Sequence, residues 1–83
     1  ALVAFPGGMG TMDELFEVMT LVQTRKAKPV PIILFGIEYW KRLINFEVMV
    51  EQGTISKEDL SLFTYTDDPQ EAWNTIKAFY KLD

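Results

Sequence analysis

The residues best suited to chemistry lie in one glycine-rich segment near the N-terminus. Residues 5–14 read Phe-Pro-Gly-Gly-Met-Gly-Thr-Met-Asp-Glu and join a short apolar run to the start of a helical pattern. Glycines let the backbone take positive φ and approach a ligand closely, and the free N–H groups of a first helical turn attract anions. The segment therefore predicts a site for a phosphate or phosphoribosyl group, with a merely tight turn as the alternative.

Glu14 ends this segment and has two interpretations. Thr11-x-x-Glu14 fits a capping box, in which Thr11 caps the helix and Glu14 reaches back to the N–H of Thr11. A bound phosphate would repel a carboxylate at this helix end, so its presence also suggests an acid, a base or an electrostatic partner. The segment matches neither the P-loop, because no lysine follows the last glycine, nor the G-x-G-x-x-G spacing of dinucleotide sites.

Composition removes several other chemistries. The 83 residues contain no Cys and no His, which excludes disulfides, thiolate nucleophiles, Cys/His zinc sites and imidazole bases, and we expect no metal site. A net charge of −4, with one short basic cluster at Arg25, Lys26 and Lys28, argues against nucleic acid as a partner. No apolar stretch approaches the roughly 20 residues of a membrane span. We expect a single cytoplasmic α/β domain that does not enter a membrane.

The elements that must position the segment follow from the apolar pattern. Unbroken apolar runs at residues 2–5 and 32–35 predict strands buried in a parallel sheet, and the helical spacing over residues 12–25 between them completes a βαβ unit. The later elements expected are a helix over residues 39–52 ended by Gly53, a helical turn over 56–60 capped by Ser56 with Asp59, a strand over 62–65, and a last helix.

Two of these expected helices lead to specific predictions about packing. The helix over residues 39–52 is apolar around more than half its surface, so we expect another segment or a second subunit to cover it, with Phe46, Met49 or Val50 in a two-fold contact in the second case. At its start, Tyr39 and Trp40 follow the second strand at the ligand edge, and they are interpreted as core or interface residues in preference to base-stacking groups. For the last helix we expect Asp68 as N-cap, Glu71 as capping-box acid, and a buried stripe made of Trp73, Ile76, Phe79 and Tyr80.

Residues 6–14 resemble the P-G-G-x-G-T-x-x-E signature of the LOG family. Its members are cytokinin riboside 5′-monophosphate phosphoribohydrolases and relatives often labelled lysine decarboxylase-like. The resemblance covers essentially all of residues 1–83, as the C-terminal portion of a longer Rossmann-like domain with a three-layer parallel sheet. It implies that the 5′-phosphate is held by Gly7, Gly8, Gly10 and Thr11. It also implies that Glu14 is the catalytic acid.

The function implied is hydrolysis of a purine or cytokinin nucleoside 5′-monophosphate such as AMP, releasing free base and ribose 5-phosphate without a cofactor. The resemblance also implies a homodimer or higher homo-oligomer. The family's upstream arginine and second glycine-rich segment have no counterpart in these residues, so we expect an incomplete active site. Two alternatives remain: a non-catalytic carrier of a nucleotide or phosphate-bearing cofactor, and an assembly half whose apolar helix pairs subunits.

Lysine decarboxylation is disfavoured on chemical grounds. Decarboxylating an amino acid would need pyridoxal phosphate, held as a Schiff base by a lysine in a phosphate-lined pocket. Lys26, Lys28 and Lys41 have no such setting in the sequence. Glu38, which follows the second strand, could face the site, but a solvated acid is the simpler interpretation, and Asp67 and Asp68 are assigned to a turn and a cap.

Overall fold

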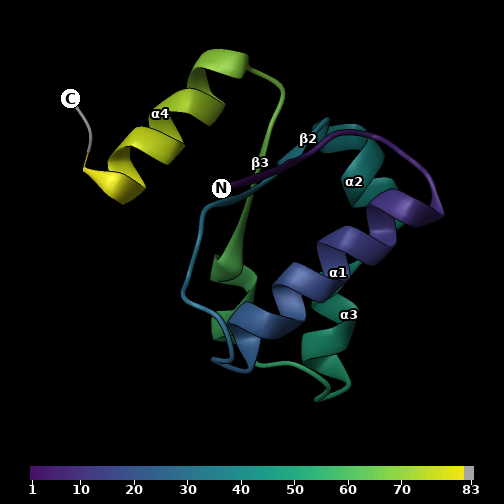
Figure 1. Ribbon diagram of the computed structural model, residues 1–83. Helices are drawn as coiled ribbons and strands as arrows, with labels where there is room; N and C mark the ends of the chain where they lie inside the picture. The colour runs from purple at the N-terminus through teal and green to yellow at the C-terminus, as the bar shows by residue number, and fades with distance from the viewer. Residues whose placement is uncertain (82–83) are drawn as a thin grey trace.

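The fold is α/β, as the sequence predicts, in a computed structural model that describes residues 1–81. A parallel three-stranded sheet has the order β1-β2-β3, and helices fill the connections. The helices α1, α2 and α3 lie on one side of the sheet, and α4 lies apart from them (Figure 1). The elements are β1 (Leu2–Ala4), α1 (Met9–Gln23), β2 (Ile32–Phe35), α2 (Ile37–Leu43), α3 (Phe46–Glu51), the 3-10 helix η1 (Lys57–Leu62), β3 (Phe63–Thr66) and α4 (Pro69–Tyr80).

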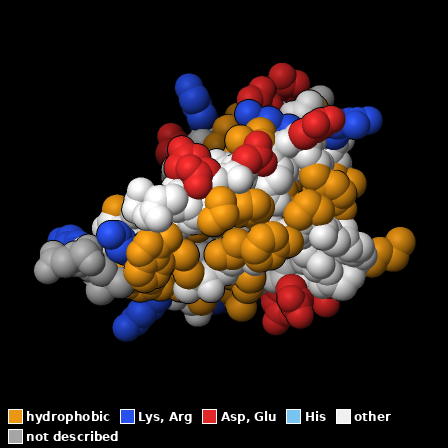
Figure 2. Space-filling view, turned by 90° about the horizontal axis from the view of Figure 1, so that it is seen from above, with side chains coloured by type: hydrophobic (Ala, Val, Ile, Leu, Met, Phe, Trp, Pro, Cys, Tyr) orange, Lys and Arg blue, Asp and Glu red, His pale blue; other side chains and the backbone are white. Residues whose placement is uncertain are grey.

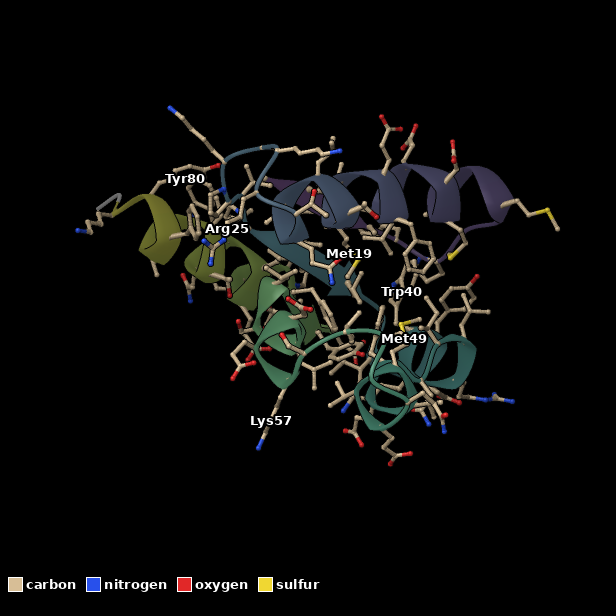
Figure 3. All side chains as sticks on the ribbon, turned by 90° about the horizontal axis from the view of Figure 1, so that it is seen from below. Met19, Arg25, Trp40, Met49, Lys57 and Tyr80 are labelled. Atoms are coloured by element: carbon tan, nitrogen blue, oxygen red, sulfur yellow. The ribbon has the colours of Figure 1, made fainter. Side chains whose placement is uncertain are left out.

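The core lies between the sheet and the helices α1, α2 and α3. Ile32 in the central strand pairs with Leu2 of β1 and with Phe63 of β3, so the chain's most apolar strand is covered on both edges. Trp40 is fully buried, and its indole N–H donates to the Phe35 carbonyl at 3.0 Å. Figure 3 shows Met19 and Trp40 in the space between α1 and α2. The assignment of Trp40 to the core is confirmed.

The single helix expected over residues 39–52 is wrong, because the chain breaks between α2 and α3. Ile44 has extended backbone angles (φ −130°, ψ 126°), and the Asn45 side chain accepts a hydrogen bond from the Val48 N–H at 3.4 Å as the N-cap of α3. The break turns Phe46 inward, where its ring lies 4.5 Å from that of Phe63. Two short helices therefore bury apolar residues that one straight helix would have spread around its surface.

The capping signals of the C-terminal half are confirmed in part. Gly53 has φ 77°, and Ser56 and Asp59 form the expected capping box of η1. The Asp68 carboxylate accepts from the Gln70 N–H at 2.9 Å as the N-cap of α4. Glu71 does not complete a capping box, since its carboxylate accepts instead from the Thr66 hydroxyl at 3.0 Å.

The buried stripe expected on α4 is also wrong. Ala72 is the buried residue of this helix, whereas Trp73 is 48% exposed and Phe79 is 47% exposed. The physical reason is that α4 contacts the sheet mainly through β3, an edge strand that covers only part of one helical face. Seen from above, hydrophobic side chains form a band across the molecule (Figure 2). The helices within residues 1–81 are all too short or too polar to cross a bilayer.

Candidate functional site

The glycine-rich segment leaves β1 at the carboxyl edge of the sheet and enters α1 at Met9. Gly8 is the N-cap, with φ −98° and ψ −150°, and the glycines with positive φ within residues 1–81 are Gly36 and Gly53. The expectation that this loop uses left-handed backbone is therefore wrong. Where the loop needs a glycine, the reason is the close approach of other atoms and not the backbone angle φ.

The glycines of the loop have two different surroundings. A Cβ atom on Gly7 would collide with the hydroxyl of Thr11, so Gly7 lets the loop fold back against the first turn of α1. A Cβ on Gly8 or Gly10 would meet no atom within 4 Å. These two positions therefore present bare, accessible backbone at the helix end, which is the surface that a ligand can approach most closely.

The first turn of α1 offers unpaired donors. The first backbone hydrogen bond of the helix runs from the Met12 N–H to the Gly8 carbonyl, at 3.1 Å. Within residues 1–81, the N–H groups of residues 8–11 donate to no protein acceptor, and no side chain caps them. Four free amides and the positive end of a 15-residue helix together form an anion-binding arrangement.

Thr11 and Glu14 do not form the capping box that the sequence allows. Because α1 begins at Met9, Thr11 lies inside the first turn and not at the N-cap. Both residues line a hollow of about 230 Å³, whose other wall is β1 and the start of the loop. The Glu14 side chain is exposed and has no hydrogen bond or ion pair with residues 1–81. Its carboxylate is therefore free to act on a ligand.

Tyr39 was assigned to the core or an interface, and the sequence interpretation missed its contact with the loop. It is half-buried at the start of α2, and its hydroxyl donates a hydrogen bond to the carbonyl of Gly7. The two residues are 32 positions apart in the chain. The available signal was that both follow parallel strands, whose carboxyl ends share one edge of a sheet.

The remaining candidate residues have structural or solvated settings. Glu38 is exposed and lies 3.5 Å from the Arg42 guanidinium, a surface pair that contributes little stability. The Asp67 carboxylate accepts from the Ile37 N–H at 2.8 Å and so links the end of β3 to the start of α2. Within residues 1–81, no three acidic, Cys or His side chains are placed to hold a metal ion.

Comparison with known proteins identifies relatives of this chain. A family model described as "Possible lysine decarboxylase" matches residues 1–76. The rice protein named "Probable cytokinin riboside 5'-monophosphate phosphoribohydrolase LOGL3" is 31% identical over 81 residues, which is 95% of this chain and 38% of the rice protein. The Arabidopsis thaliana protein named "Cytokinin riboside 5'-monophosphate phosphoribohydrolase LOG1" is 41% identical over 58 residues, or 68% of this chain and 27% of that protein.

These matches cover most of this chain but only part of each relative. A third relative, "Probable cytokinin riboside 5'-monophosphate phosphoribohydrolase LOG4" from rice, is 33% identical over 86% of this chain and 31% of its own length. The chain thus spans about a third of the curated relatives that it matches. Since the family model extends over residues 1–76 and the relatives carry one common name, the chain belongs to the LOG family.

Proposed function

We propose that this protein hydrolyses the N-glycosidic bond of a nucleoside 5′-monophosphate such as AMP and releases the free base and ribose 5-phosphate. Membership of a family whose relatives carry phosphoribohydrolase names supports a hydrolase. The observation that carries the proposal is the combination, near one helix end, of four N–H groups and the carboxylate of Glu14, none of which has a partner within residues 1–81.

In this proposal the loop holds the 5′-phosphate. The amides of residues 8–11 donate to the phosphate oxygens, and Gly8 and Gly10 allow the close approach, because no side chain stands between backbone and ligand. The Thr11 hydroxyl, which has no protein partner within residues 1–81, adds a fifth donor. Gly7 contributes by letting the loop pack against Thr11.

Glu14 acts at the other end of the ribose. The C1′–N bond breaks with its electron pair leaving on the base, the oxygen of water bonds to C1′, and a proton from water ends on the base. The sugar becomes oxocarbenium-like on the way, so a carboxylate near C1′ stabilises the developing positive charge or takes the proton of the attacking water. The proton that Glu14 takes from the attacking water can then pass to the leaving base, so the same group serves as the base and then as the acid.

The name of the matching family model suggests a different reaction, amino-acid decarboxylation. That reaction requires a lysine beside the phosphate site to hold pyridoxal phosphate. Lys26, Lys28 and Lys41 are all exposed, and none lines the hollow that contains Thr11 and Glu14. The residues that line this hollow therefore include no lysine for a Schiff base, and glycosidic hydrolysis is favoured over decarboxylation.

The test is product analysis with two matched substrates. We expect the protein expressed from its gene to release adenine from AMP, measured by chromatography, and to release little from adenosine, because adenosine lacks the phosphate that the loop binds. A comparison of AMP with a cytokinin riboside 5′-monophosphate then ranks the bases. AMP binding without any release of base from either nucleotide would overturn the proposal and favour a non-catalytic carrier.

A further inference from the structure

We infer that Tyr39 is a positioning residue that orients the glycine-rich loop for anion binding. The inference rests on the proposed function for the identity of the anion, a nucleoside 5′-monophosphate. Its structural basis is the hydrogen bond from the Tyr39 hydroxyl to the Gly7 carbonyl, which joins the start of α2 to the loop before α1.

The Tyr39 ring packs against its buried neighbour in α2. It packs edge-on against Trp40, with ring centroids 5.4 Å apart and an interplanar angle of 89°. Trp40 is fully buried and is itself bonded to the Phe35 carbonyl. A phenol anchored in this way presents its hydroxyl at a fixed point, so the hydrogen bond to Gly7 restrains the loop more than it restrains Tyr39.

The start of α2 is also fixed against the neighbouring strand and the loop. The Gly36 N–H donates to the Thr66 carbonyl at 2.9 Å, and the Ile37 N–H donates to the Asp67 carboxylate at 2.8 Å. Gly36 has φ 103°, and a Cβ there would lie 3.2 Å from the Pro6 ring. The turn between β2 and α2 is therefore a rigid support, packed closely against the residue that precedes Gly7.

Planarity of the peptide bond carries this restraint to the anion site. The carbonyl of Gly7 and the N–H of Gly8 belong to one trans peptide unit, and they point in opposite directions. With the carbonyl fixed toward Tyr39, the Gly8 N–H points away from Tyr39. That N–H has no protein acceptor within residues 1–81, and a Cβ on Gly8 would meet nothing. Tyr39 thereby orients the first donor of the anion site without touching the ligand.

The test is Tyr39→Phe, which keeps the ring and removes the hydroxyl, with Tyr65→Phe as matched control. Tyr65 is half-buried in β3, and its hydroxyl makes no hydrogen bond to the loop. We expect Tyr39→Phe to raise the Kd and KM for AMP about fivefold, the effect of losing one part-buried hydrogen bond. We expect kcat at saturation to stay near wild type and adenosine binding to be unchanged.

The NMR order parameter of the Gly8 N–H, which reports how firmly the amide is oriented, separates this inference from the proposed function. A lower order parameter at Gly8 in Tyr39→Phe, without a change in Tyr65→Phe, supports positioning even if the wild type releases no base. An unchanged Gly8 order parameter and unchanged AMP affinity in Tyr39→Phe would overturn the inference, even if the wild type hydrolyses AMP. Equal loss of AMP affinity and of Tm in both variants would also overturn it, because the effect would then be a general loss of stability.

Discussion

At the scale of single residues, the three glycines of the loop have different roles. Gly7 is required by the fold, because any side chain there meets Thr11, whereas Gly8 and Gly10 have open space beside them. Gly8 and Gly10 have no neighbour that excludes a side chain, and they lie among amides that are unpaired within residues 1–81. A functional reason for glycine at these positions is therefore clearer than a structural one. This difference makes the phosphate-binding role of the loop separable from its stability.

We therefore predict opposite effects for alanine at Gly7 and at Gly8. Gly7→Ala should lower stability by about 1–3 kcal/mol, the usual cost of overpacking, as measured by urea unfolding. Gly8→Ala should leave stability within about 0.5 kcal/mol, because its φ is negative and its Cβ has room. The same Gly8→Ala protein should lose AMP affinity at least tenfold in calorimetry. Wild-type affinity in Gly8→Ala would mean that no ligand approaches this backbone.

At the scale of the elements, apolar periodicity predicted the strands and most helices because burial in a parallel sheet leaves unbroken apolar runs. Apolar periodicity failed where a capping residue begins a new helix within a continuous apolar pattern. Apolar residues continue from Tyr39 to Val50, so the Asn45 cap was hidden inside an apparently single helix. The α4 stripe failed for another reason: its 3.6-residue period is real, but the edge strand β3 is too narrow to bury it.

The link between η1 and α1 gives a prediction about pH. The Gln23 side-chain N–H bonds the Asp59 carboxylate at 2.9 Å, and this bond and the Ser56 N–H lower the pKa of Asp59 below its usual value. A lowered folded pKa stabilises the fold above the unfolded pKa of about 3.9, and this contribution is lost as the pH falls through the folded pKa.

We expect the Asp59→Asn protein to lose less stability than the wild type as the pH falls. In urea unfolding at a series of pH values, the wild type should lose stability below about pH 4, and Asp59→Asn should lose less over the same range. Glu58→Gln is the matched control, since Glu58 is exposed and lies next to Asp59. The link has no role in acid stability if wild type and Asp59→Asn keep a constant difference at every pH.

At the scale of the whole molecule, the candidate site was easier to predict from the sequence than the residues that hold its loop in place. The loop, Thr11 and Glu14 are adjacent in the chain, so a local motif could predict them. Tyr39 could not be found this way, because its hydrogen bond to Gly7 depends on how two strand ends meet at one sheet edge. Phe46 was counted among the apolar surplus of its helix, yet it is 5% exposed and packs within the chain.

We predict assembly into a dimer or higher oligomer through apolar residues that the chain leaves exposed on α2 and α3. Leu43 is 50% exposed and Val48 is 42% exposed. Light scattering of the protein at about 100 μM should give a mass of two or more subunits, and Leu43→Asp or Val48→Asp should reduce it. Phe46→Asp is no test of assembly, because it places a charge in the core. A monomeric wild type at this concentration would contradict the prediction.

The most direct test of the whole account is turnover of AMP by Glu14→Gln, measured as adenine release under saturating substrate. Glu14 makes no hydrogen bond or ion pair within residues 1–81, and its charge repels a bound phosphate, so its replacement by Gln should lower neither Tm nor AMP affinity. Turnover should fall at least about 100-fold, as expected on loss of an acid or base that acts on the reacting bond. Glu17→Gln, an exposed acid farther along α1, should keep wild-type turnover. Retention of adenine release by Glu14→Gln would contradict the account.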